Sequence, residues 1–169
     1  PQSNEVTAAA IVNTWNEREI ARIVAEYGEE RFAARIARAI VRTREQRPIT
    51  RSSELAEIVK NAVPGFARRS RIHPATRTFQ ALRIEVNQEF KNLEGFLNNA
   101  PGILARNGVC AIITFHSIED RMVKQRFRIY AKEGGFELVI KKPISASYDE
   151  VQINPRARSA KMRAIRKRN

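Results

Sequence analysis

The chain has 169 residues, which is enough for one well-packed core or for a small domain joined to part of a second one. Its hydrophobic content of 43% is typical of a folded protein, and no apolar run approaches the roughly 20 residues that a membrane-spanning helix needs. The formal net charge of +13 exceeds what solubility requires, so we expect a polyanionic partner, for which RNA is the commonest candidate.

Cysteine usage and the first residues favour a cytoplasmic protein. The start PQSNEVTAAA lacks the basic and apolar segments of a signal peptide, and the only cysteine, Cys110, lies in an apolar run, as expected of a reduced thiol. Cys110, His73 and His116 are the only nitrogen or sulfur ligands of the usual kind, so we expect no metal site.

Residues 1–62 are expected to be helical throughout, because their apolar positions recur at helical spacing. A first helix is predicted over 6–15 and a second over 17–27, closing at Gly28 in a left-handed cap. A third helix, within EERFAARIARAIVRTREQRP, has an apolar face and a basic face. The basic face consists of Arg31, Arg35, Arg38 and Arg42.

A fourth helix and then a basic linker are predicted after this helix. Pro48 ends it, and Thr50 or Ser52 is expected to cap a fourth helix that runs to Pro64. Proline, glycine and basic residues then mark a linker near residues 64–72, where we place a domain boundary.

A long helix is predicted from Pro74 through Leu93, with one apolar side. Beside that side runs a second stripe, made of Thr76, Gln80, Arg83 and Asn87. A solvated helix edge would explain such a row. Amide and guanidinium groups aligned without lysine or glutamate are also suited to holding a substrate.

The remaining residues follow an α/β layer pattern. VCAIITF, residues 109–115, is apolar and β-branched, as expected of a central strand that is buried on both faces. A helix is predicted over 116–135, a strand over 136–142 and a last short strand over 161–167. A central strand needs a pairing strand on each side, and these two weaker strands are the only candidates that the sequence offers.

Polar residues, HSIEDR, come directly after the central strand. Ser117 is expected to cap the following helix, with Asp120 completing a capping box, so these two have a structural explanation. His116, Glu119 and Arg121 lie where ligands bind in open α/β sheets, at the carboxyl end of a strand. The glycines of a serine-hydrolase elbow or of a phosphate-binding loop are missing around these residues.

Three segments, YGEERFAARIARAI, HPATRTFQALRIEVNQEF and ITFHSIEDRMVKQRF, resemble in order and spacing the RsmH (MraW) family. The resemblance implies an S-adenosylmethionine-dependent methyltransferase that modifies the exocyclic amino group of a cytosine in 16S ribosomal RNA. Members of that family are nearly twice this long and begin with a half that carries the cofactor loop. Cofactor contacts are therefore expected mainly in that half.

The resemblance also implies a fold class: α/β with an all-α inserted domain, that is, a helical bundle plus the second half of a Rossmann-like (class I) methyltransferase fold. Residues 1–70 would be the inserted domain that recognises the RNA substrate, and 71–169 the closing half of the catalytic domain. An apolar sheet face covered by a second copy would give a homodimer.

Site roles follow from the same resemblance. We expect His116, Ser117 and Asn87 to be catalytic, with the row on the long helix facing the first two. Substrate contacts are expected from Arg77, Gln80, Arg83, Glu119 and Arg121. For the arginines a structural ion pair with Glu85, Glu119 or Asp120 is the alternative.

Ribosomal RNA, or the small ribosomal subunit, is the expected partner, and no membrane is. Its backbone would be held by the basic helix face and by the basic tail, namely Arg31, Arg35, Arg38, Arg42, Arg156, Arg158, Lys161, Arg163 and Arg166. A solvated basic end is the alternative for the tail. The alternative function is a non-catalytic ribosomal RNA-binding module without a cofactor site.

Overall fold

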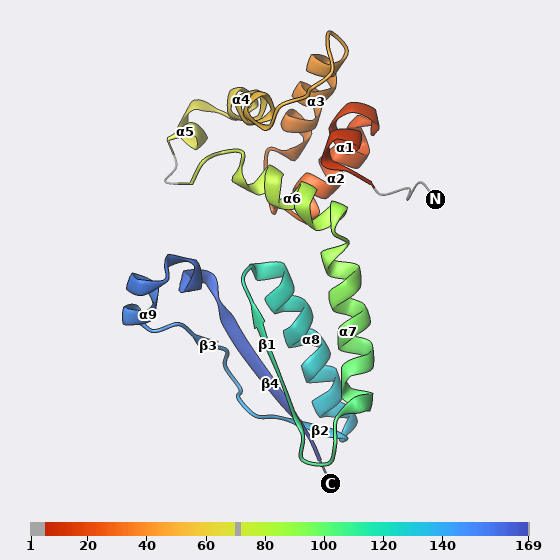
Figure 1. Ribbon diagram of the computed structural model, residues 1–169, viewed down its shortest axis with the longest axis vertical. Helices are drawn as coiled ribbons and strands as arrows, with labels where there is room; N and C mark the ends of the chain where they lie inside the picture. Colours follow the sequence, from red (N-terminus) through yellow and green to blue (C-terminus); the bar gives the residue numbers. More distant parts are fainter. Residues whose placement is uncertain (1–5, 70–71, 169) are drawn as a thin grey trace. The chain divides into compact units, whose positions relative to one another are not determined.

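The computed structural model describes residues 6–69 and 72–168, which form two compact units. The first unit extends to Glu89 and the second begins at Phe90. The first is all-helical (Figure 1), with helices α1 Ala8–Thr14, α2 Glu17–Glu26, α3 Ala33–Arg44, α4 Ser52–Ala62, α5 Gly65–Arg68 and α6 Thr76–Val86.

The core of the helical unit comes from apolar residues spaced by three and four. Ile20, Ile23 and Val24 of α2 are fully buried, and so are Ile36 and Ile40 of α3. Each such side chain contributes roughly 1.5–3 kcal/mol when it leaves water. Helix α3 packs between α2 and α4, so one apolar stripe serves two neighbours.

Helix α6 belongs to the helical unit, which moves the unit boundary away from the linker predicted at residues 64–72. Ala81 and Leu82 of α6 are part of the same buried core as α2, because the apolar side of α6 packs on α2 and α1. The expected roles of the two halves, as inserted domain and closing half, stay predictions.

Two helix ends differ from those predicted. Gly28 does not adopt a left-handed conformation, whereas Glu29 has φ 47°. A Cβ on Gly28 would lie 2.6 Å from the Arg77 carbonyl oxygen, so close backbone approach requires this glycine. Helix α4 has Arg51 at its N-cap, with no side-chain hydrogen bond to the cap.

The long helix predicted from Pro74 is two helices. The first, α6, begins only at Thr76, and α7, Glu89–Ile103, follows after a break. Gln88 has φ 50° at this break, a left-handed conformation that a continuous helix does not contain. Apolar spacing alone does not reveal such a break, because the stripe continues on both sides of it.

The second unit is a mixed α/β layer (Figure 1). Apart from α7, its elements are β1 Val109–Thr114, α8 Ser117–Glu133, β2 Phe136–Leu138, β3 Ile144–Ser145, α9 Tyr148–Ile153, the 3₁₀ helix η1 Pro155–Ser159 and β4 Lys161–Lys167. The segments β3, α9 and η1 were not predicted, and the strand predicted over 136–142 ends at Leu138.

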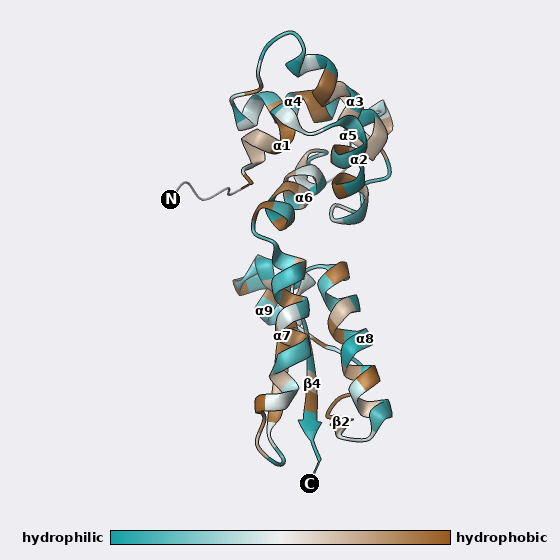
Figure 2. Ribbon diagram, turned by 90° about the vertical axis from the view of Figure 1, so that its right-hand side faces the viewer, coloured by the Kyte–Doolittle hydropathy of each residue, from teal (hydrophilic) through white to brown (hydrophobic). Residues whose placement is uncertain are grey.

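Strand β4 is the centre of the sheet. The order is β1-β4-β2, β3 also pairs with β4, and every pairing is antiparallel. Ile165 of β4 is buried with Leu97, Val123 and Phe127 from α7 and α8. Figure 2 shows that these two helices carry apolar and hydrophilic stretches in alternation, as expected of helices with one buried face. The parallel part of a Rossmann-like sheet is not among the described strands.

Strand β1 is not buried on both faces, contrary to prediction. It pairs only with β4 among the described strands, and Val109, Ile113 and Phe115 are 47%, 58% and 55% exposed. Ile112 on the other face packs against the core with Cys110. The apolar composition was interpreted correctly as a strand, but β1 is an edge strand with one apolar face open.

No helix in the described ranges is long and apolar enough to cross a membrane.

Candidate functional site

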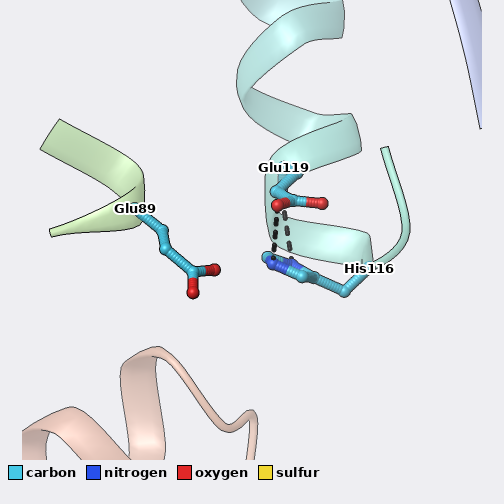
Figure 3. Close-up of side chains that lie close together, drawn as sticks. All are labelled: Glu89, His116 and Glu119. Carbon is cyan, nitrogen blue, oxygen red and sulfur yellow. Dashed lines mark hydrogen bonds and ion pairs between the residues drawn. The ribbon is translucent and has the colours of Figure 1, made fainter. Parts of the chain in front are cut away.

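The start of α8 is organised by His116 and Glu119 (Figure 3). His116 is the N-cap, in extended conformation, and its Nδ1 accepts a 3.4 Å hydrogen bond from the Glu119 N–H. Nε2 of the same ring lies 3.1 Å from Glu119 Oε1, in a geometry too poorly aligned for a hydrogen bond. This arrangement puts the ring proton on Nε2.

Glu119 completes this cap from the other side. Its Oε2 accepts a 3.0 Å hydrogen bond from the Phe115 backbone N–H. Burial raises the pKa of Glu119, but the contacts with His116 and the Phe115 N–H outweigh burial, so its pKa lies below the ordinary value. The imidazole side chain is only 12% exposed, and Phe90 meets it edge-on with ring centres 5.6 Å apart. A largely buried, oriented imidazole and carboxylate can exchange a proton or hold a polar ligand.

The predicted cap formed by Ser117 and Asp120 is wrong. The helix begins one residue earlier than a serine cap requires, so Ser117 is its first residue. Asp120 instead accepts two hydrogen bonds from Arg163 of β4, at 2.7 and 3.0 Å, and lies 3.6 Å from Lys161 Nζ. The Arg163 guanidinium holds the pKa of Asp120 below its ordinary value. This buried ion pair ties α8 to the sheet.

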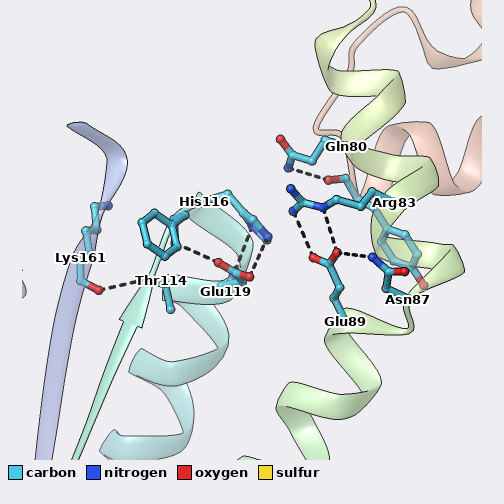
Figure 4. A network of polar contacts seen from close by, with 10 residues as sticks. Gln80, Arg83, Asn87, Glu89, Thr114, His116, Glu119 and Lys161 are labelled. Atoms are coloured by element: carbon cyan, nitrogen blue, oxygen red, sulfur yellow. Dashed lines mark hydrogen bonds and ion pairs between the residues drawn. The ribbon is translucent and has the colours of Figure 1, made fainter. Parts of the chain in front are cut away.

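The polar row on α6 makes contacts within the helical unit (Figure 4). Arg77 donates to the carbonyl oxygen of Glu29 at 3.1 Å. Gln80, which Figure 4 labels, donates to that of Tyr27 at 3.2 Å. Both side chains therefore hold the turn that follows α2. The Arg77 side chain remains 54% exposed, so its guanidinium can still meet solvent or a ligand.

At the end of this row, Arg83 forms a bidentate pair with Glu89. Its Nε and Nη2 donate to the two carboxylate oxygens at 2.8 and 3.1 Å, and Asn87 Nδ2 donates to Oε1 at 3.2 Å. Figure 4 shows the three side chains around the break between α6 and α7. A structural ion pair was the alternative to a substrate contact for the arginines, but the acid that Arg83 uses, Glu89, was missed. Its place six residues on, beyond an unpredicted break, hid it from helical spacing.

The structure thus forms two clusters from the expected site residues. One is the α6 row with Glu89, and the other is the start of α8, where the exposed Ser117 and Arg121 follow His116. That the row faces His116 stays a prediction.

The basic face of α3 lines a groove with α4. Arg35, Arg38 and Arg42 are exposed and border an open volume of about 970 Å³, whose other side includes Glu57 and Ile58. Arg38 lies 3.5 Å from Glu17, an exposed pair that is worth little. Arg31 lies before α3 and contacts aromatic rings instead.

The basic tail is folded into the 3₁₀ helix η1 and the strand β4. Arg156 and Arg158 lie exposed in η1, whereas Lys161, Arg163 and Arg166 belong to the central strand β4. Arg163 is paired with Asp120, and Arg166 lies 3.1 Å from Glu137. The RNA contacts expected of these residues stay predictions, with the Arg163 guanidinium already occupied inside the protein.

An imidazole and carboxylate pair behind a strand, in a chain that also carries a basic helical unit, is an arrangement suited to acting on a polyanion. The model of the MraW methylase family matches residues 1–168, and the chain belongs to this family. This confirms the resemblance seen in the three sequence motifs.

Relatives with the name Ribosomal RNA small subunit methyltransferase H match nearly the whole chain. The protein from Synechocystis sp. is 53% identical over 162 residues, that from Trichodesmium erythraeum 52% over 166, and that from Symbiobacterium thermophilum 49% over 179. These matches cover 96%, 98% and 97% of the chain, but only 51%, 56% and 56% of the relatives. The chain spans about half the length of the curated relatives it matches.

Proposed function

We propose that the chain is the substrate-side half of an enzyme that transfers a methyl group from S-adenosylmethionine to the exocyclic amino group of a cytosine in 16S ribosomal RNA, in the decoding region. The observation that carries this proposal is the family membership, together with relatives of about 50% identity named ribosomal RNA small subunit methyltransferase H. The substrate is the RNA or the small ribosomal subunit, which sets the protein in the cytoplasm.

The chemistry of this transfer makes specific demands on the protein. The cytosine amino nitrogen is a poor nucleophile because its lone pair is delocalised into the ring. The enzyme must hold it in line with the sulfonium methyl group and accept hydrogen bonds from the amine. It must also grip a base that has left its stack.

Residues at the start of α8 are suited to this task. The Glu119 carboxylate is held ionised and oriented by His116 and Phe115, so it can accept hydrogen bonds. In our proposal His116 and Ser117 border the target base together with Asn87. Gln80, Arg83 and Arg121 position this nucleotide, and Arg77 contacts another part of the RNA substrate. The cofactor contacts lie mainly in the part of the relatives that this chain does not match.

A second candidate is a non-catalytic ribosomal RNA-binding module. The observation that favours it is the net charge of +13, with exposed arginines on α3 and η1. Both candidates share RNA binding, and they differ in whether S-adenosylmethionine is used.

Calorimetric titration of the chain with S-adenosylmethionine is the first test, followed by transfer of a labelled methyl group to small ribosomal subunits that lack the modification. Binding and transfer by the chain would support the enzyme. If the chain binds RNA but not the cofactor, the same assay on the full-length Synechocystis relative decides: absence of transfer to ribosomal RNA there would overturn the proposed activity.

A further inference from the structure

A small pocket on the helical unit combines aromatic and cationic side chains. Its volume is about 300 Å³, and it is lined by Arg31, Phe32, His73 and Arg77 among others. Phe66 of the short helix α5 does not line the pocket, but it contacts Phe32, which does: the two ring centres lie 6.0 Å apart in an edge-to-face arrangement. All of these residues belong to the first unit.

The ring of Phe66 is open to solvent. Its exposed fraction is 66%, although its neighbour Val63 is buried. An exposed phenylalanine beside buried residues gains nothing for the core, and such rings mark interaction sites when they gather with other groups.

The guanidinium of Arg31 lies over the rings of both Phe32 and Phe66 and adds a positive charge to this aromatic pair. Its guanidinium carbon lies 4.6 Å from the Phe32 ring centre and 5.1 Å from that of Phe66. Aromatic faces and arginine planes are the two surfaces on which proteins stack unpaired nucleobases. Here they lie next to one another and are already ordered by mutual contact, which lowers the entropy cost of binding.

The buried carboxylate of Glu30 holds two of the residues that line the pocket, Phe32 and Arg77. Glu30 is only 8% exposed, and its Oε1 accepts a 2.9 Å hydrogen bond from the Phe32 N–H. Its Oε2 lies 3.9 Å from Arg77 Nη1, which also donates to the Glu29 carbonyl oxygen. The exposed part of the Arg77 guanidinium thus lies at a defined place in the same pocket, where a phosphate can meet it.

We propose that this pocket binds one unstacked nucleotide of single-stranded RNA, with its base stacked on Phe66 and Arg31 and its phosphate at Arg77. The proposal rests on the proposed function in taking RNA as the partner. It adds a base contact, at a place other than the start of α8, to the backbone contacts expected of the basic face of α3.

The test measures binding of two fluorescein-labelled probes to the full chain: a short single-stranded oligoribonucleotide and an abasic strand of the same length. Phe66→Ala is expected to weaken binding of the first about tenfold, as loss of one stacked base does, and to leave the abasic strand unaffected. Phe96→Ala is the matched control, because Phe96 is 49% exposed but lies on α7. It is expected to change neither affinity.

Phe66→Trp supplies a second readout, which does not depend on the alanine variant remaining folded. The base-bearing strand is expected to quench the added indole, whereas the abasic strand is not. An unquenched indole, or equal affinities of wild type and Phe66→Ala for the base-bearing strand, would overturn the pocket while RNA binding itself stands. If neither strand binds the wild type, the pocket and the RNA partner are both wrong.

Discussion

His116 caps α8 and is proposed to border the substrate, and two substitutions can distinguish these roles. His116→Ala should remove the cap at a cost of about 1 kcal/mol, whereas His116→Asn keeps an N-cap acceptor and most of that stability. Hydrogen exchange of the α8 amides checks this. Methyl transfer by the matching variants of the full-length Synechocystis relative should fall sharply for both. Normal transfer by the asparagine variant would reduce His116 to a cap.

Asp120 is expected to be the most sensitive carboxylate of the second unit. Asp120→Asn leaves the Arg163 guanidinium, whose side chain is 13% exposed, without its partner, at a cost of about 3 kcal/mol at neutral pH. The loss is measured by faster hydrogen exchange in β4 and α8. Asp149→Asn, on the exposed start of α9, is the matched control and should change little.

The pH dependence of this pair has a definite sign. The pKa of Asp120 is lowered in the folded protein, so its contribution is complete above the ordinary pKa of about 3.9 and is lost as pH falls through the lower folded value. The difference between wild type and Asp120→Asn should therefore shrink below about pH 4. A difference that persists at lower pH would contradict the ion pair.

At the residue scale, residue types could be predicted better than partners. The sequence singled out His116 and Glu119, and the structure brings both into one cap. It also suggested an ion pair for Arg83, yet the acid used is Glu89, because a partner across a helix break is set by tertiary geometry and not by spacing. Phe66 was not noticed, since a single aromatic residue in a linker has no periodic signal.

Among the helices, α2 and α6 approach each other so closely that only glycine fits at position 28. Gly28→Ala would place a Cβ 2.6 Å from the Arg77 carbonyl oxygen and 2.7 Å from that of Val24, and backbone must move, at a cost of about 2 kcal/mol. Urea unfolding followed by the fluorescence of the single tryptophan, Trp15, measures this loss.

The matched control is Gly95→Ala on α7. Apart from neighbouring residues of α7 itself, nothing lies within 4 Å of the added methyl group there. The variant should therefore slow hydrogen exchange in α7 by stabilising the helix about 0.5–1 kcal/mol. Equal effects of the two substitutions would show that helix propensity, and not close approach, governs Gly28.

The exposed apolar face of the edge strand β1 is expected to promote self-association. The homodimer suggested by the sequence would be one form of it. Ile113→Lys places a charge on the exposed apolar face and should reduce association of the chain in sedimentation velocity runs. Ile153→Lys, at an 87% exposed position of α9, is the control and should leave it unchanged. If Ile113→Lys left the association unchanged, this face would be excluded as the surface through which the chain associates.

At the element scale, the helices α1 to α4 and the strands β1 and β4 could be predicted, because each has a clear apolar period or run. The position of each strand in the sheet could not. VCAIITF has the composition of a central strand but lies at an edge, whereas KMRAIRK was the weakest strand signal and lies at the centre. Strand order depends on pairings between distant segments, which composition does not encode.

For the whole molecule, the charge of +13 predicts RNA binding that weakens steeply with salt. Arg42→Ala, on the α3 groove, should lower the slope of log affinity against log salt by about 1, as loss of one phosphate contact does. Arg22→Ala is the control, because Arg22 is paired with Glu26 on α2. Filter binding at several salt concentrations measures both. Equal slopes for wild type and Arg42→Ala would exclude the groove as the backbone site.

Because β4 pairs with the three other described strands of the sheet, the sheet cannot be completed during synthesis until β4 has been made. Thr114 of β1 and Lys161 of β4 are 47 positions apart, and β1, β2 and β3 all pair with β4. At roughly 5–20 residues per second, β1 leaves the peptidyl transferase centre several seconds before its partner does. The helical unit, made earlier and without strands, can fold during that interval. The nascent sheet stays incomplete, and its apolar strand available to chaperones, until the last strand arrives.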